Sequence, residues 1–114
     1  MHDETRAPLR FGIAGAGAIA RRFCRDVNGH ARGAEVVAIA ARDQGRADEF
    51  ARDLGLPHAY GSYEALAASP EVEAVYVAVI HPEHAGLVRQ MLLAGKHVLV
   101  EKPAVTRVAD WDAL

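Results

Sequence analysis

Residues 9–20, LRFGIAGAGAIA, decide the fold that we expect for this 114-residue chain. The apolar run LRFGIA is typical of a buried strand, and it stops at the tripeptide GAG. Beyond this turn Ile19, Phe23 and Val27 recur at helical spacing. The Asn-Gly pair that begins at Asn28 is expected to end the helix. The stretch therefore predicts a strand, a tight glycine turn and a helix.

The same alternation continues along the chain. Residues 35–41, EVVAIAA, show no polar alternation, as expected of a strand that is buried on both faces. Asp43 stands where it can cap the next helix, and Gly55 stands where that helix would end. A short strand over 58–60 and a short helix capped by Ser62 are expected to follow.

The last third of the chain predicts a fourth strand and helix pair and a final, fifth strand. Residues 72–80, VEAVYVAVI, form the most apolar stretch, and a helix is expected over 82–94. Its inward face is expected to carry Val88, Met91 and Leu92. A strand over 97–100 and a helix that begins near Thr106 complete the prediction.

Such an alternation of strands and helices predicts a doubly wound α/β fold with a parallel sheet. Parallel strands need crossover connections, and right-handed crossovers place helices on both faces of the sheet. In a Rossmann sheet of order 3-2-1-4-5-6, this chain would supply strands one to five. The fifth strand would then be an exposed edge, which proteins seldom leave uncovered.

The glycine turn carries the first chemical signal. GAGAIA matches the dinucleotide-binding pattern G-x-G-x-x-G/A and stands between a predicted strand and a predicted helix. Gly15 would allow the tight turn, Gly17 would let the backbone approach a pyrophosphate, and Ala20 would permit close packing. Free N–H groups where the helix starts, at Ala18 and Ile19, would face the anion. The alternative is a tight turn without a ligand. We expect one dinucleotide-binding domain over 1–114, with an ordered core over about 9–110.

The end of the second predicted strand bears on the choice of cofactor. An NAD site usually has Asp or Glu there, bound to the ribose 2′-hydroxyl. This chain has Arg42, with Arg46 one helical turn further on. Two guanidinium groups suit the 2′-phosphate of NADP, which binds charge-assisted donors. Solvated arginines at a helix start are the alternative, and Asp43 keeps NAD open as the cofactor.

Two further segments should open at the same edge of the sheet as the glycine turn. HPEH at 81–84 follows the fourth strand, and EKP at 101–103 follows the fifth. The chain has only two lysines, Lys96 and Lys102, so a lysine at this edge is notable. Its ammonium could hydrogen-bond a substrate hydroxyl or carbonyl. A solvated lysine paired with Glu101 is the alternative.

Composition argues against several other classes of protein. Lys and Arg number 13 against 15 Asp and Glu, and no basic block occurs, so we expect no nucleic-acid partner. No apolar run approaches the roughly 20 residues of a membrane span, and no signal peptide is visible. The single cysteine, Cys24, is interpreted as a packed thiol rather than a reactive one. His81 and His84 lack further ligands at metal spacing, so we expect no metal site. Because neither secretion nor membrane insertion is indicated, we expect a cytoplasmic protein.

The motifs GAGAIA, AIAARD, AYGSYEAL, HPEH and AGKHVLVEKP together resemble the N-terminal nucleotide-binding domain of the Gfo/Idh/MocA family. The resemblance covers residues 9–109 and is greatest to the branch of trans-dihydrodiol and D-xylose dehydrogenases, which uses NADP. It implies that Lys102 contacts the reacting hydroxyl and helps to position the nicotinamide. It further implies that the cofactor is contacted by Arg42, Arg46, His81, Pro82 and Glu101. Of these, Arg42 and Arg46 match the contacts to the 2′-phosphate.

The resemblance implies an oxidoreductase that transfers hydride between nicotinamide and a sugar, cyclitol or dihydrodiol. Family members continue into an α/β substrate domain, so we expect this chain alone to bind nucleotide with little or no turnover. A non-catalytic dinucleotide sensor or assembly module is the alternative. The missing sixth strand predicts self-association into a homo-oligomer.

Overall fold

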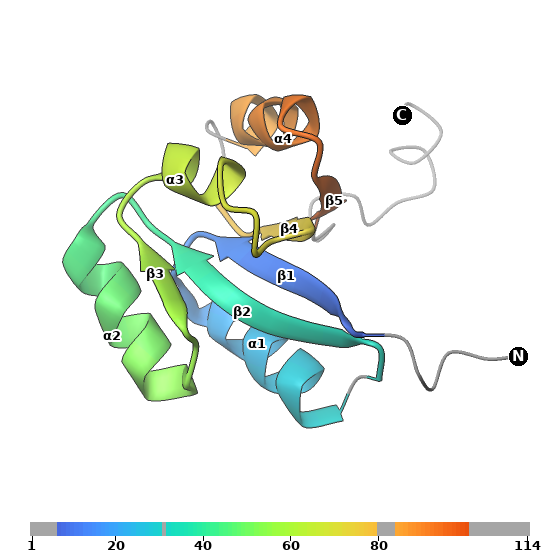
Figure 1. Ribbon diagram of the computed structural model, residues 1–114. Coiled ribbons are helices and arrows are strands. Elements are labelled where there is room, and N and C mark those ends of the chain that lie inside the picture. The colour runs from blue at the N-terminus through green and yellow to red at the C-terminus, as the bar shows by residue number, and fades with distance from the viewer. Residues whose placement is uncertain (1–6, 31, 80–83, 101–114) are drawn as a thin grey trace, which may run out of the picture.

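The computed structural model describes residues 7–30, 32–79 and 84–100. In chain order the elements are β1 (Leu9–Ala14), α1 (Ala18–His30), β2 (Ala34–Ala40), α2 (Gln44–Leu54), β3 (His58–Tyr60), α3 (Tyr63–Ala67), β4 (Ala74–Val77), α4 (His84–Leu93) and β5 (His97–Val100). These strands form one parallel sheet in the order β3-β2-β1-β4-β5. The predicted doubly wound α/β fold and its strand order are confirmed (Figure 1).

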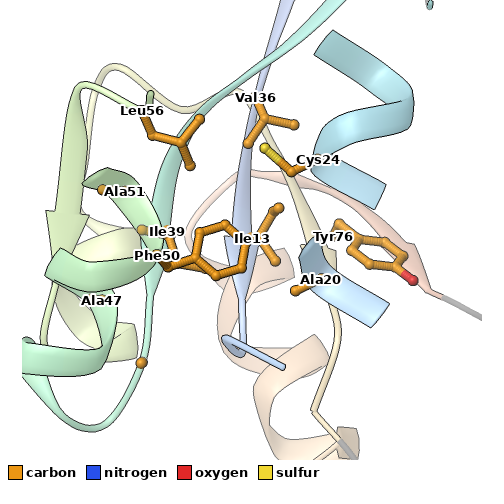
Figure 2. Packing of buried hydrophobic residues seen from close by; sticks show 11 residues of the cluster. Ile13, Ala20, Cys24, Val36, Ile39, Ala47, Phe50, Ala51, Leu56 and Tyr76 are labelled. Carbon is orange, nitrogen blue, oxygen red and sulfur yellow. The ribbon is translucent and has the colours of Figure 1, made fainter. Parts of the chain in front are cut away.

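Helices cover both faces of the sheet, and each face has its own apolar cluster. Helices α1 and α2 cover one face, where Ile13 of β1 packs with Phe50 of α2 (Figure 2). Helices α3 and α4 cover the other face, where Leu66 and Met91 are fully buried. Gly12 of β1 lies against α3 on this face. A side chain there would collide with that helix, because a Cβ on Gly12 would lie 2.6 Å from Leu66 Cδ1.

Sequence signals at the helix ends are confirmed for the second and third helices. The Asp43 side chain accepts a hydrogen bond from the Gly45 amide, and Gly55 ends α2 with φ +74°. Ser62 caps α3 in the same way, through the Ala65 amide. Helix α1 differs from the prediction, because it runs past Asn28 to His30.

Neither Asn28 nor Gly29 adopts the positive φ of a left-handed helix cap, so α1 continues through both, and the Asn28 side chain bonds to β2. The side-chain oxygen accepts from the Val36 amide at 2.8 Å, and the side-chain nitrogen donates to the Val36 carbonyl at 3.3 Å. Asn28 therefore ties α1 to β2 and does not act as a helix stop.

Two further predictions need correction. The strand expected over 72–80 is shorter, Ala74–Val77, although Val72 is buried just ahead of it. In α4, Met91 is buried as predicted, but Leu92 is 56% exposed and Leu87 takes the inward position. Leu87 and Met91 are four residues apart and so share a helix face, whereas Leu92 is rotated about 100° from Met91. The predicted helix near Thr106 lies outside the described residues.

Within the described ranges, no helix is long and apolar enough to cross a membrane.

Candidate cofactor site

The glycine turn is anchored between the two strands that flank β1. The Gly15 amide donates to the Ala40 carbonyl of β2 at 2.9 Å, and the Ala78 amide donates to the Ala14 carbonyl at 2.8 Å. Gly15 has φ +110°, and a Cβ there would lie 3.1 Å from both the Ala78 carbonyl carbon and Val79 Cγ1. Both its backbone conformation and its surroundings therefore require glycine, as the tight-turn prediction expects.

Gly17 is in a different situation from Gly15. It is exposed, and a Cβ built on it would meet no atom within 4 Å. Its carbonyl accepts the first helical hydrogen bond, from the Arg21 amide at 3.1 Å. Nothing in the described protein thus requires glycine at this position. The bare backbone and open space beside it leave room for the close approach of a phosphate group.

The start of α1 lies open beside this space. Ala18 and Ile19 are exposed, and the first turn carries no acidic residue. Amide groups in the first turn of a helix lack carbonyl partners within the helix, and the helix dipole favours an anion there. The third position of the glycine pattern, Ala20, is fully buried. This burial agrees with the predicted close packing of α1 on the sheet.

The two arginines after β2 are exposed, and one of them contacts the turn. Arg46 Nη2 donates to the Ala16 carbonyl at 3.4 Å, which places its guanidinium group beside the glycine turn. Arg42 lies directly after the buried Ala41, at the carboxyl edge of the sheet. Asp43 serves as the cap of α2, so the capping interpretation is confirmed.

The other predicted site residues, His81, Pro82, Glu101 and Lys102, lie outside the described residues. The structure does place the strands that lead to them. Val77 at the end of β4 is in register with both Ala14 of β1 and Val100 of β5. The carboxyl ends of the three strands therefore lie at one edge. In the described ranges, no group of three or more His, Cys, Asp or Glu side chains could hold a metal ion.

Cys24 lies outside this edge, in the apolar cluster under α1. Its side chain is 1% exposed, and burial raises the pKa of the thiol, while Arg25 acts in the opposite direction. The interpretation as a packed cysteine is confirmed.

A hollow of about 460 Å³ lies at the opposite edge of the sheet, lined by residues such as Pro8, Asn28, Glu35 and Pro57. It is therefore separate from the glycine turn.

Two basic side chains make contacts that the sequence analysis did not predict. The Lys96 ammonium donates to the carbonyls of Ser69 and Val72, each at 2.6 Å. Arg21 reaches from α1 to α2, where it pairs with Asp53 at 3.2 Å and lies over the Phe50 ring.

The sheet order and a glycine turn at its carboxyl edge define a dinucleotide-binding α/β domain of the Rossmann type. A comparison with known families is more specific. The model of the oxidoreductase family with an NAD-binding Rossmann fold, GFO_IDH_MocA, matches residues 9–114. The chain belongs to this family, which confirms the resemblance seen in its motifs.

Similar proteins are named dehydrogenases and reductases. The trans-1,2-dihydrobenzene-1,2-diol dehydrogenase of Mus musculus is 48% identical over 103 residues, which cover 90% of this chain and 31% of that protein. A 3-ketoreductase from Actinomadura kijaniata, solved with TDP-benzene and NADP, has a TM-score of 0.77 and 36% identity, covering 93% of this chain and 33% of that one.

A second solved structure holds the other cofactor. The myo-inositol dehydrogenase from Lactobacillus casei, in complex with NAD(H) and myo-inositol, has a TM-score of 0.77 and 27% identity. The match covers 93% of this chain and 32% of that one. This chain thus spans about a third of the length of the proteins it matches.

Proposed function

We propose that the chain is the cofactor-binding domain of an NADP-dependent oxidoreductase acting on CH–OH groups. The observation that carries the choice of NADP is the position of Arg46, whose guanidinium group is held at the glycine turn, with Arg42 exposed nearby. Asp43, the carboxylate that follows Arg42 in the sequence, is engaged as a helix cap. The site thus presents cations where a 2′-phosphate would lie, whereas an NAD site would present a carboxylate to the ribose.

The described residues fit a dinucleotide. The open space beside Gly17 and the exposed amides of Ala18 and Ile19 would hold the pyrophosphate. Arg42 and Arg46 would bind the 2′-phosphate through charge-assisted hydrogen bonds. When bound, the nicotinamide would supply the hydride chemistry, and the domain would fix its position.

The residues after β4 and β5 complete the proposal. We place His81, Pro82 and Glu101 along the cofactor. The Lys102 ammonium would hydrogen-bond the reacting oxygen and stabilise negative charge that develops on it, or transfer its proton. The substrate would be a sugar, cyclitol or dihydrodiol, held by a second domain. On this proposal 1–114 is a single dinucleotide-binding domain of a cytoplasmic enzyme.

Calorimetric titration of the purified chain with NADPH and NADH tests the cofactor assignment. We expect NADPH to bind more tightly, because only NADPH carries the 2′-phosphate. In Arg42→Ala the affinity for NADPH should fall by roughly tenfold, while that for NADH should change little. Arg22→Ala is the matched control, since Arg22 is exposed on α1 and carries the same charge. Equal affinities for the two nucleotides, or equal losses of both in Arg42→Ala, would refute the proposal.

Self-association through β5 is also proposed. β5 forms one edge of the described sheet and leaves Leu99 44% exposed. An uncovered edge strand is a template for pairing, and a second copy of this chain would cover it. Sedimentation should show a mass that rises with concentration. A monomer at every concentration would contradict this expectation.

A further inference from the structure

One face of α2 is turned toward the glycine turn and α1. Arg46, Phe50 and Asp53 are spaced four and three residues apart, so they form a single stripe along the helix. Each of these three side chains contacts a residue outside α2. Arg46 donates to the Ala16 carbonyl in the turn, and the other two contact Arg21 of α1.

Arg21 therefore joins the two helices through two different interactions. Its guanidinium carbon lies 5.1 Å from the centre of the Phe50 ring, within the range of a cation–π contact. Its Nη1 lies 3.2 Å from Asp53 Oδ2. Phe50 is fully buried in the cluster beneath the helices (Figure 2), so it provides a fixed platform for the arginine.

The contact made by Arg46 is sensitive to where α2 lies. Its hydrogen bond to the Ala16 carbonyl measures 3.4 Å, which is longer than the roughly 2.7–3.2 Å of an ordinary N–H···O bond. A small movement of α2 away from α1 would break this bond and release the Arg46 side chain. The Arg21 contacts, which lie one and two turns further along the same stripe, oppose that movement.

We infer that Arg21 is a positioning residue for Arg46: by holding α2 against α1 it keeps the Arg46 guanidinium group at the turn, and it thereby increases the preference of the site for a 2′-phosphorylated ligand. Arg21 does not itself contact the 2′-phosphate in this inference. The inference rests on the proposed function, in which Arg46 binds that phosphate.

The experiment compares 2′,5′-ADP with 5′-ADP, two probes that differ by the 2′-phosphate. The quantity measured in the full chain is a ratio of dissociation constants: that of 5′-ADP divided by that of 2′,5′-ADP. A higher ratio means a stronger preference for the 2′-phosphate. Arg21→Met should lower the preference for 2′,5′-ADP by roughly fivefold, or about 1 kcal/mol. In an Arg46→Met background the same substitution should leave the ratio unchanged, because the residue through which Arg21 acts is gone.

Three further variants test whether Arg21 acts by positioning Arg46, by its positive charge alone or only by stabilising the fold. Arg22→Met removes the same charge from an exposed neighbour on α1 and should leave the ratio unchanged. Asp53→Asn removes only the ion pair and should lower the ratio less than Arg21→Met. Arg21→Lys keeps that pair and should restore part of the preference. A purely structural role would lower the melting temperature without changing the ratio.

The outcomes distinguish this inference from the proposed function. If the unmodified chain binds neither probe, or binds both equally, the proposed function fails and the inference fails with it. If the unmodified chain prefers 2′,5′-ADP and Arg21→Met keeps that preference, the inference alone is refuted. It is also refuted if Arg21→Met lowers the ratio equally in both backgrounds, or if Arg22→Met has the same effect.

Discussion

Gly15→Ala is expected to lower the free energy of unfolding by about 2 to 3 kcal/mol. An alanine at φ +110° is strained, and its Cβ would press on the backbone of Ala78, which is held by its hydrogen bond to Ala14. Thermal unfolding should show a melting temperature lower by roughly 10 °C or more. An unchanged melting temperature would mean that the turn can adopt another conformation at little cost.

Gly17→Ala is the matched variant, two residues further along the same turn. Its Cβ would meet no protein atom within 4 Å, so we expect only the cost of a poorer helix cap, about 1 kcal/mol or less. The affinity for NADPH should nevertheless fall by at least roughly tenfold, because the new methyl group enters the space assigned to the pyrophosphate. Retained affinity at retained stability would contradict that assignment.

Lys96→Met is expected to have the second large effect on the free energy of unfolding. Lys96 lies just before β5, at the edge of the sheet opposite the glycine turn. Burial lowers the pKa of the Lys96 ammonium, and the carbonyls of Ser69 and Val72 compensate by accepting hydrogen bonds from the charged group. Methionine would fill the space but leave the Val72 carbonyl without this donor, and the Ser69 carbonyl would keep only the Val72 amide at 3.3 Å. We expect a loss of about 2 kcal/mol in the free energy of unfolding.

Urea denaturation measures this loss, with Arg89→Met on the exposed side of α4 as the control for removing one cation. The control should change stability by less than about 0.5 kcal/mol. Affinity for NADPH should be retained in Lys96→Met at temperatures where the chain stays folded, because Lys96 lies away from the turn. Equal stability of the two variants would show that water replaces the ammonium without cost.

Much of the fold could be predicted because its signals are local. Asp43 and Ser62 cap their helices through neighbouring amides, and Gly15 is required by the conformation of its own turn. The inward face of α4 was only partly predictable, because α4 has apolar residues at 87, 88 and 91–93, which surround more than half of the helix. Periodicity alone then cannot choose between Leu87 and Leu92.

The contacts that join distant parts of the chain could not be predicted from the sequence. Lys96 meets Ser69, 27 residues earlier, and Arg21 meets Asp53, 32 residues later. Neither pair has a sequence signature, because each depends on how two packed elements approach each other. The glycine pattern predicted a phosphate site, but the contact of Arg46 with that turn appears only once α2 is placed beside α1.

The hydrogen bonds of the glycine turn have a consequence for how the site opens. The Gly15 amide bonds to β2, and the carbonyl just before it bonds to the segment after β4, so the turn continues the central ladders of the sheet. The Gly15 amide hydrogen should therefore exchange with solvent deuterium as slowly as the amide hydrogens of the core strands. The turn is thus formed without a ligand, and under the proposed function the pyrophosphate site would be lost only when the sheet itself comes apart.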